Sequence, residues 1–484
     1  MSLQMALEVE RSSDDSLTSQ IQQFIKNEIA AGVLHPGTRL PSSRRLASDL
    51  DVSRSVVVEA YGQLVAEGYL EAAQGSGTRV VDHLPASGAV VPALLDEGWV
   101  PAVRWDLRPG AGNTPAFPRR EWLGCYQRAL QGAGPESHAY PPLAGMAELR
   151  IELARYLGRA RGVRTTPGEV LVVSGFAQAL GLLCGVLPQF GITELGMEDP
   201  GHPGQRQFVR ESGLRPVPVP VDEDGIDVDA LARTGVRAVV VTPAHQFPTG
   251  VGLTPARRAA LAAWAREVDG WVIEDDYDGG LWYERGGRPL ALQRLDPERV
   301  VYAGTASKTL APGLRLGWVA APPQLLGPLL RHRARHDLGT ESLTQLAFAE
   351  LLRSGLFDRH LRRITTLCRS RREALVEAVR KHLPGTTVLG ARAGLHAYLR
   401  LPPGTDEAAL VAGALRRSVL VRGAAGFHVR RPWDAPALVV GHAHLPRSAL
   451  TEAVRHLGSV GHWFEPSASP RPGSSAASAG RRWS

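Results

Sequence analysis

Lysine is rare in this chain, and one lysine occupies a position suited to covalent chemistry. Only Lys26, Lys308 and Lys381 occur among the 55 basic residues, which leaves 52 arginines. Lys308 directly follows a predicted strand that ends near Tyr302, and α/β sheets hold their ligands at the ends of such strands. An amine there can form an imine with an aldehyde, which an arginine cannot. A lone lysine is more often a solvated surface residue, so its neighbours must decide between the two interpretations.

Asp275 and Tyr277 end a second predicted strand, which begins at Trp271. A carboxylate at this place can keep a pyridine nitrogen protonated, so that the ring withdraws electrons, and the phenol can hydrogen-bond the ring oxygen. Alternatively, the acidic run 274–278 is a solvated strand end or a metal site. A metal needs a defined set of ligands, which His245 alone does not supply, and we therefore expect no metal.

A third group of residues is suited to holding a phosphate. The segment 174–177 lies between a predicted strand and an apolar helix, so its backbone amides would point out of a helix N-terminus. Hydroxyl groups and a guanidinium near Lys308 add further donors, and the guanidinium can bind a phosphate with two parallel hydrogen bonds. The candidate phosphate ligands are Ser174, Gly175, Phe176, Ala177, Thr305, Ser307 and Arg315.

These candidate residues must be positioned by a sheet with helices around it. Short apolar runs at 169–173, 238–241, 271–273 and 299–302 alternate with helical patterns. Alternation of this kind is typical of helices that cover a largely parallel sheet. We therefore expect an α/β domain whose strand ends carry the three groups.

The N-terminal residues predict a different, smaller domain. Leu17, Ile21, Ile25 and Ile29 have four-residue spacing and indicate one apolar helix face over 17–29. Two further short helices follow, the first capped by Ser42 or Ser43 and the second capped by Ser53 and ended by Gly68. Strands over 69–71 and 78–81 flank the turn 74–77, whose glycines allow positive φ. Three helices and a hairpin describe a winged helix-turn-helix.

In such a domain the start of the third helix faces base edges, and neighbouring groups hold phosphates. Ser53, Arg54 and Ser55 occupy that start, while Arg44 and Arg45 begin the preceding helix, where they can meet the DNA backbone. The wing also carries an arginine, Arg79, within reach of a groove or phosphate. Each of these arginines, taken singly, is equally consistent with an ordinary surface residue.

The charge distribution does not decide the question of DNA binding. The chain has a net charge of +7 and a pI near 9.6, which suggests a polyanionic partner. Residues 11–81, however, contain seven Lys and Arg against eight Asp and Glu. The excess lies in arginine-rich segments such as 359–380, which we interpret as solvated helix faces. The prediction of DNA binding therefore depends on the residue pattern.

The remaining composition limits the class of protein. Cys125, Cys184 and Cys368 lie far apart without a CxxC pair, so we expect reduced, mostly structural cysteines. No apolar run approaches the length that crosses a bilayer, and the first residues show no leader peptide. We expect a cytoplasmic protein with no membrane contact.

The segment 15–81 resembles the winged helix of the GntR family of regulators almost end to end. The patterns L-P-S-x-R, L-A, V-S-R, A-Y, E-G and G-S-G-T appear in order and without a gap. The resemblance implies double-stranded DNA as a partner, with contacts from the two arginine-bearing helix starts and the wing. The resulting DNA-binding set is Ser42, Ser43, Arg44, Arg45, Ser53, Arg54, Ser55, Gly75, Ser76, Gly77, Thr78 and Arg79.

The segment 106–463 resembles the fold type I aminotransferases, and the whole chain resembles the MocR/GabR group of regulators. The resemblance to this group rests on the motifs PAHQFPTG (243–250), IEDDYD (273–278) and GTASKTLAPGLRLGW (304–318). The resemblance implies pyridoxal 5′-phosphate (PLP) as cofactor and a homodimer. In it, Lys308 forms the Schiff base, an internal aldimine, Asp275 pairs with the pyridinium, Tyr277 binds the ring oxygen and Arg315 binds the phosphate. His245 or Gln246 would lie against the ring, and Tyr140 would reach the phosphate of the neighbouring subunit.

Two positions depart from that group. Where the group usually has L-R-L-G-F, with an arginine that holds an amino-acid carboxylate, this chain has Val439 in Leu438–His442. His202 stands where the group more often has a tyrosine beside the cofactor. Arg422, Arg430 and Arg431 are candidate replacements for the lost charge. Both departures weaken the case for an amino-acid effector and for efficient transamination.

We therefore predict a multidomain chain: an α+β winged helix-turn-helix (11–81), a linker (82–105), an α/β fold type I aminotransferase-like PLP domain (106–463) and a disordered tail (464–484). The leading hypothesis is a transcriptional regulator that senses PLP or an amine, with vitamin B6 or amino-acid metabolism genes as targets. A working PLP-dependent aminotransferase with an appended DNA-binding domain is the alternative. A third hypothesis is a regulator whose aminotransferase-like domain has lost the cofactor and serves only for dimerisation.

Overall fold

The computed structural model describes residues 9–11, 15–73, 77–82, 103–110, 112–284, 287–429 and 435–460. The chain divides into two compact units, Met1–Pro101 and Ala102–Ser484, and each is described by itself. Most of the predicted linker and the whole predicted tail lie outside the described residues. No helix in the described part of the chain combines the length and apolar character that crossing a membrane requires.

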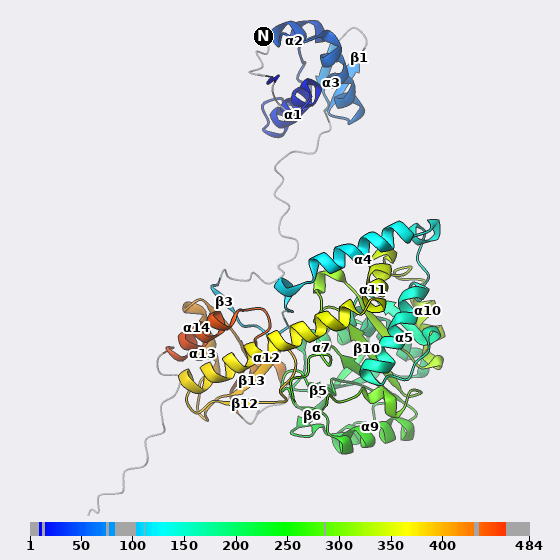
Figure 1. The fold of residues 1–484 in the computed structure, drawn as a ribbon, viewed down its shortest axis with the longest axis vertical. Coiled ribbons are helices and arrows are strands. Elements are labelled where there is room, and N and C mark those ends of the chain that lie inside the picture. Colours follow the sequence, from blue (N-terminus) through cyan, green and yellow to red (C-terminus); the bar gives the residue numbers. More distant parts are fainter. Residues whose placement is uncertain are drawn as a thin grey trace, which may run out of the picture. The chain divides into compact units, whose positions relative to one another are not determined.

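The first unit consists of three helices and a hairpin (Figure 1). Ser42 caps the second helix by accepting a hydrogen bond from the backbone amide of Arg45, which decides between the two predicted caps. The two strands of the hairpin pair antiparallel, so the wing is formed as the sequence indicates. The elements are α1 (Leu17–Ala30), α2 (Ser43–Asp49), α3 (Arg54–Ala66), β1 (Leu70–Ala73) and β2 (Gly77–Val80).

The four-residue spacing of apolar residues places one face of α1 in the core of this unit. Ile21 and Ile25 are buried against Leu64 of α3 in one cluster. The hydroxyl of Tyr61 donates to the carbonyl oxygen of Pro41 over 3.0 Å, which ties α3 to the segment before α2. Val65 is 38% exposed and does not join this core. It lies one position beyond Leu64, about 100° further round the helix.

The second unit contains an eight-stranded mixed sheet in the order β4-β11-β10-β9-β8-β5-β6-β7. The five strands from β10 to β6 are parallel, and β11 runs antiparallel to both of its neighbours. The sheet is therefore largely parallel, as the sequence predicts. Its strands are β4 (Val170–Val173), β5 (Glu194–Asp199), β6 (Arg215–Asp222), β7 (Gly225–Ile226), β8 (Ala238–Val241), β9 (Trp271–Asp276), β10 (Val300–Thr305) and β11 (Gly317–Ala320).

Helices cover both faces of this sheet because its strands are apolar on both sides. On β4, Val170 and Val172 enter one hydrophobic cluster, whereas Leu171 and Val173 enter another. This alternation is expected of a strand buried on both faces. The helices are α4 (Arg119–Gly132), α5 (Ala147–Arg161), α6 (Phe176–Val186), α7 (Pro203–Glu211), α8 (Val228–Arg233), α9 (Pro255–Glu267), α10 (Pro323–Arg333) and α11 (Ser342–Arg353).

A long helix, α12 (Leu356–His382), connects this layer to a smaller antiparallel sheet (Figure 1). That sheet has the order β12-β13-β16-β15 and packs against α12 and two further helices. A short parallel pair, β3 and β14, lies beside them. The elements are β3 (Trp105–Asp106), β12 (Thr387–Leu389), β13 (His396–Arg400), α13 (Glu407–Arg416), β14 (Val419–Leu420), β15 (Arg422–Gly423), β16 (Ala437–Gly441) and α14 (Arg447–Gly458).

Candidate functional site

A cavity of about 430 Å³ lies where β9 and β10 end, and it collects most of the predicted cofactor ligands. A site at the carboxyl ends of parallel strands follows from the topology of α/β sheets. Ser174, His245, Gln246 and Tyr140 do not line the cavity. The predicted residues that do line it are Lys308, Asp275, Tyr277, Arg315, Gly175, Phe176, Ala177, Thr305, Ser307 and His202.

The amine of Lys308 faces this cavity and donates a hydrogen bond to the carbonyl oxygen of Gly110 over 2.6 Å. Burial lowers the pKa of Lys308, although the carboxylates of Asp275 and Asp278 act in the opposite direction. A lowered pKa increases the fraction of the neutral amine, which is the form that attacks an aldehyde. The environment of Lys308 therefore favours imine chemistry over a solvated ammonium group.

Asp275 is a buried carboxyl group at the end of β9. Burial raises its pKa to about 8, while one hydrogen bond from the amide of Gln205, 3.4 Å long, acts against that rise. A buried carboxylate is stable only with a partner that compensates its charge. A protonated ring nitrogen in the cavity would be such a partner, so the donor set fits a pyridinium.

The predicted phosphate cradle is formed by a helix N-terminus and one arginine. Gly175 precedes α6 with φ +101° and ψ 175°, a conformation that residues with a side chain rarely adopt. A Cβ at Gly175 would lie 3.5 Å from the guanidinium of Arg315, so the arginine stands directly over the start of the helix. Within the described residues, that guanidinium has no acidic partner. A cation and free helix amides together suit a phosphate.

The hydroxyl groups beside Lys308 are linked to each other. Thr305 contacts the Ser307 hydroxyl over 2.9 Å and accepts a hydrogen bond from the Ser307 amide over 3.1 Å. On the other side of the cavity, His202 lies 5.5 Å from the ring of Phe247, measured between ring centroids. Burial lowers the pKa of His202, which keeps its imidazole neutral beside Lys308. A neutral ring offers an aromatic face to a ligand.

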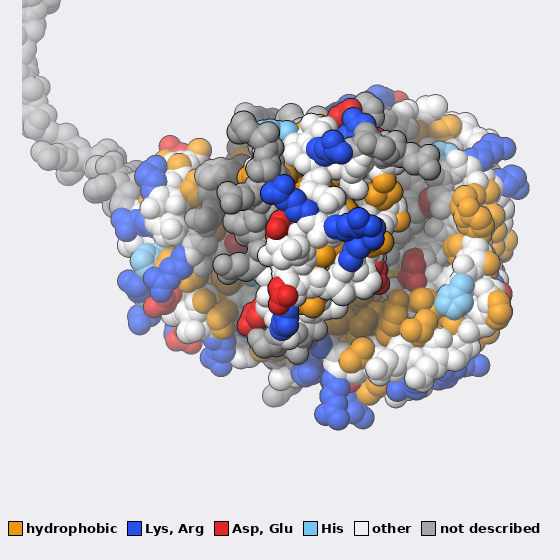
Figure 2. Space-filling model, turned by 90° about the horizontal axis from the view of Figure 1, so that it is seen from above, with side chains coloured by type: hydrophobic (Ala, Val, Ile, Leu, Met, Phe, Trp, Pro, Cys, Tyr) orange, Lys and Arg blue, Asp and Glu red, His pale blue; other side chains and the backbone are white. Residues whose placement is uncertain are grey.

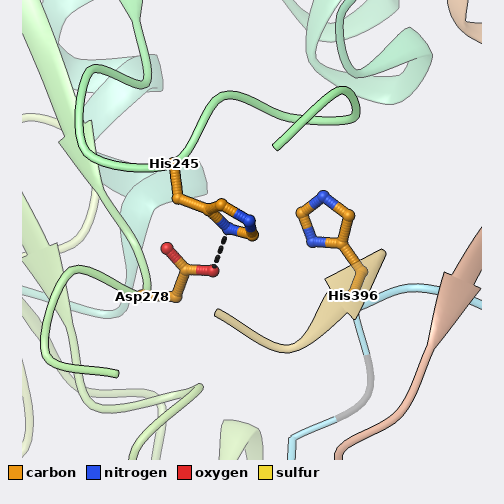
Figure 3. Close-up of side chains that lie close together, drawn as sticks. All are labelled: His245, Asp278 and His396. Atoms are coloured by element: carbon orange, nitrogen blue, oxygen red, sulfur yellow. Dashed lines mark hydrogen bonds and ion pairs between the residues drawn. The ribbon is translucent and has the colours of Figure 1, made fainter. Parts of the chain in front are cut away.

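Three buried side chains, of which only His245 belongs to the predicted set, lie together next to Tyr277. The Nδ1 atom of His245 is 2.9 Å from Oδ2 of Asp278, and the ring of His396 lies 4.6 Å from that of His245 (Figure 3). The ligand atoms of these three residues lie within 4.8 Å of one another, so the expectation that His245 stands alone is wrong. Each group already has a protein partner, because Nε2 of His396 is also bonded to the carbonyl oxygen of Pro248 over 3.1 Å.

This buried group of residues positions Tyr277. The phenol of Tyr277 donates to the backbone carbonyl of His245 over 2.9 Å, and its oxygen lies 3.3 Å from the Nδ1 atom of the same residue. Asp278 in turn fixes the His245 ring, and Gly394 packs so closely against this contact that a Cβ there would lie 2.3 Å from Asp278 Oδ2. We therefore interpret the group as a hydrogen-bonded support for the tyrosine.

Two residues that were predicted to lie against the cofactor ring are placed differently in the structure. His245 and Gln246 are buried but do not line the cavity, and Phe247 lines it instead. The side-chain amide of Gln246 is fully used by protein partners: it donates to the carbonyl oxygens of Pro200 and Phe247 and accepts from Thr249. Its polar atoms are therefore not free for a ligand.

Val439 fills the place at which a carboxylate-binding arginine is expected. It is fully buried on β16 and belongs to an apolar cluster with Tyr398 and Phe427. Arg422 pairs in register with Val439, but its side chain is exposed and does not line the cavity. The other two candidate replacements, at 430 and 431, lie outside the described residues.

The predicted DNA-contacting side chains at the two helix starts are exposed, apart from the half-buried Ser43. Arg44 and Arg45 lie at the start of α2, and Ser53, Arg54 and Ser55 lie at the start of α3. The Nε atom of Arg54 approaches the Ser43 hydroxyl at 3.4 Å, which brings the two helix starts together. The third helix begins with free backbone amides, because the Ser53 hydroxyl contacts Ser55 rather than an amide.

The wing is described only in part. Arg79 forms an ion pair with Glu71 across the hairpin, 3.0 Å long, and Thr78 lies on the same strand, which begins at Gly77. Gly75 and Ser76 lie outside the described residues. On the face drawn in Figure 2, Lys and Arg side chains are spread over the surface and do not form one patch, in agreement with the charge count.

Several functional positions were missed by sequence reasoning. Gly110, Gln205, Phe247 and His396 line the cavity or contact its ligand candidates, and they come from four separate segments. No local spacing connects them. One signal for His396 was available in the sequence. It lies on a strand two residues after a glycine, and a glycine in a strand pattern often marks a place where a ligand or another backbone approaches closely.

Comparisons with known proteins give two family matches and many relatives. Residues 111–457 match the family of aminotransferases class I and II, and residues 17–80 match the bacterial regulatory proteins of the gntR family. The chain is 32% identical to the probable rhizopine catabolism regulatory protein MocR of Rhizobium meliloti, over 94% of this chain and 95% of the relative. It is 35% identical to the pyridoxine biosynthesis transcriptional regulator PdxR of Corynebacterium glutamicum, over 79% and 83%.

Among solved structures, the second unit is similar to LysN, the alpha-aminoadipate aminotransferase of Thermus thermophilus. The TM-score is 0.65 and the identity 30%, over 73% of this chain and 91% of LysN. That structure holds N-(5′-phosphopyridoxyl)-L-leucine.

Proposed function

This chain belongs to the MocR/GabR subgroup of the GntR family, with a GntR winged helix followed by a fold type I aminotransferase domain, and from that premise we propose that it is a PLP-dependent transcriptional regulator. The observation that carries the proposal is the convergence of Lys308, Asp275 and Arg315 on one cavity in a chain with a DNA-binding domain. The residues present fit the three chemical groups of the cofactor: aldehyde, pyridine and phosphate.

Bound PLP supplies an aldehyde that reacts with amines and a ring that withdraws electrons. The residues of the chain would hold it at three points. Lys308 offers the amine, Asp275 would keep a proton on the ring nitrogen, and Arg315 with the start of α6 would bind the phosphate. The hydroxyl of Tyr277 would turn its one hydrogen from the His245 carbonyl to the ring oxygen.

The presence of Val439 instead of an arginine favours a role in sensing an effector over the catalytic turnover of amino acids. An aminotransferase must hold the carboxylate of its amino acid, and a buried valine in an apolar cluster offers no charge for that purpose. We propose PLP itself, or an amine that reacts with the bound cofactor, as the effector, and vitamin B6 genes as targets. The similarity to PdxR supports this choice, because its printed name refers to pyridoxine biosynthesis.

The test is a titration of DNA binding to the protein's own promoter region with and without PLP. Wild type is compared with Lys308→Ala and with Lys381→Ala, which removes an exposed lysine of α12. We expect PLP to change the operator affinity of wild type and Lys381→Ala but not of Lys308→Ala. Lack of any PLP effect together with a clear effect of an amino acid would contradict PLP as the signal.

Two measurements separate this proposal from the other hypotheses. Steady turnover of an amino donor with an oxo acid, abolished in Lys308→Ala, would instead indicate an aminotransferase. Absence of the visible absorbance band of bound cofactor in protein saturated with PLP would indicate a domain that has lost the cofactor.

A further inference from the structure

A second cavity, outside the proposed cofactor site, has four arginines among its lining residues. It has a volume of about 450 Å³ and lies between the end of α5, the first half of α12 and the segment after β9. Its polar lining consists of Arg159, Arg288, Arg362, Arg369, Asp358 and three hydroxyl side chains. Four cations therefore face a single carboxylate.

One face of α12 supplies half of these cations. Arg362 and Arg369 are seven residues apart and so lie on the same side of the helix, two turns from each other. Thr365 and Thr366 lie on the turn between them and also line the cavity. In the described part of the chain, neither guanidinium has a carboxylate within ion-pair distance. These arginines belong to the basic segment 359–380, whose charge the proposed function does not use.

The opposite wall is cationic as well. Arg159, near the end of α5, pairs with Asp358 over 2.7 Å, so the one carboxylate of the cavity is already neutralised. Arg288 donates to the carbonyl oxygen of Ala160 and has no carboxylate partner among the described residues. Burial and the neighbouring Arg161 lower the pKa of Arg288, whereas Tyr156 and Asp276 act in the opposite direction.

We propose that this cavity binds a small molecule with several negative charges, either a phosphate ester or a polycarboxylate. Guanidinium groups bind both kinds of oxyanion with paired hydrogen bonds. The Thr365 hydroxyl adds a neutral donor, whereas the Thr366 hydroxyl donates to the carbonyl oxygen of Arg362 over 3.0 Å. The volume is in the range of small-ligand sites, and a concave site with converging cations is suited to a compact anion.

A buried ion pair joins a residue next to the lining of this cavity to a residue next to the lining of the proposed cofactor site. Arg161 binds Asp276 at 2.6 Å, and Asp276 follows Asp275 directly on β9. Tyr302 donates to the same carboxylate over 2.6 Å. An anion beside Arg288 would reduce the repulsion between Arg288 and Arg161 and so act on the strand end that carries Asp275.

The test is calorimetric titration of the full-length, PLP-loaded protein with pyrophosphate and, separately, with citrate at constant ionic strength. We expect saturable binding of at least one of them, with one site per chain. The double variant Arg362→Gln/Arg369→Gln should weaken that binding at least tenfold. The control Arg359→Gln/Arg380→Gln, with the same loss of charge from exposed positions of α12, should change it less than twofold.

The two anions identify the class of ligand. Binding of pyrophosphate alone indicates a phosphate ester, and binding of citrate alone indicates a polycarboxylate. The cofactor absorbance band, recorded on the same samples, should stay unchanged in both double variants, which separates this site from the PLP site. Absence of saturable binding, or equal weakening in the control, would overturn the proposal. Displacement of the anion by duplex DNA would also overturn it and would indicate a nucleic-acid surface instead.

Discussion

Among individual residues, Asp275 would strengthen ligand binding, but its burial lowers the free energy of unfolding of the ligand-free protein. Its pKa is raised to about 8 in the folded protein, whereas an unfolded aspartate titrates near ~3.9. Between these values the unfolded state loses a proton that the folded state keeps, so the free energy of unfolding falls as pH rises from about 4 to about 8. Each unit of difference corresponds to about 1.4 kcal/mol, and relaxation of the site reduces the total to a few kcal/mol.

The first prediction follows from that sign. Asp275→Asn removes the titrating group, so the cofactor-free variant should be more stable than wild type at pH 8, by several degrees in Tm, and equally stable near pH 4. Its affinity for PLP should fall at least tenfold, because the ring nitrogen loses its carboxylate. Thermal unfolding at both pH values and a cofactor titration measure the two effects. Asp229→Asn, at an exposed position, should change neither; a less stable Asp275→Asn at pH 8 would contradict the argument.

At this scale the sequence predicted which side chains meet at the cavity better than it predicted their hydrogen-bond partners. Lys308, Asp275 and Arg315 were found because their residue types are specific and each follows a predicted strand or loop. The partners of His245 were not found, because Asp278 and His396 reach it only through the fold. The same reason explains Gln246, which donates to the carbonyl oxygen of Pro200, 46 residues away.

At the scale of elements, the start of α6 should be sensitive to its one special backbone position. Gly175→Ala places a Cβ on a residue with φ +101° and ψ 175°, a conformation that is almost restricted to glycine. We expect a loss of about 1–3 kcal/mol in stability and at least a tenfold weaker affinity for PLP, because the helix amides move. Denaturant unfolding and a titration with PLP measure both.

Gly191→Ala is the matched control for this change. Gly191 also has positive φ, +71°, but lies in the ordinary left-handed region with open space around it and away from the cavity. It should lower stability by about 1 kcal/mol and leave the affinity for PLP unchanged. Equal losses of PLP affinity in both variants would show that the start of α6 has no special role.

The start of α3 gives a separate prediction for DNA binding. Arg54 is exposed, and its removal leaves no buried group without a partner. Arg54→Ala should therefore lower operator affinity by about 1–3 kcal/mol with no change in Tm. Lys26→Ala on α1 removes a cation that is paired with Glu67 and should leave the operator affinity unchanged. An unchanged affinity in Arg54→Ala would exclude the predicted docking of α3.

The elements themselves were largely predictable. The spacing on α1 and the apolar runs at β4, β8, β9 and β10 indicated the correct element types because burial on one or two faces leaves a regular pattern. The order of the strands, with β11 inserted antiparallel between β4 and β10, cannot be read from local patterns because it depends on pairing between distant segments.

At the scale of the whole molecule, α4 presents an apolar surface that the described residues of the chain do not cover. Leu123 and Leu130 are 58% and 48% exposed and lie seven residues apart on one face, while Cys125 on the same helix is buried in the core. Tyr140, which the family resemblance assigns to a neighbouring subunit, is 85% exposed. Exposed apolar groups of this kind mark an interaction surface, and we infer that a second copy of the chain covers it.

The last prediction concerns that second copy. Leu123→Gln/Leu130→Gln should convert the protein from a dimer of twice 52.0 kDa to single chains in sedimentation experiments, because the apolar contact is lost. Operator affinity should then fall by at least tenfold, since two linked winged helices bind with a higher effective concentration than one. PLP affinity should fall as well if Tyr140 reaches the partner's site. Leu415→Gln, at an exposed position of α13, should alter none of the three. A dimer that persists in the double variant would place the subunit contact elsewhere on the molecule.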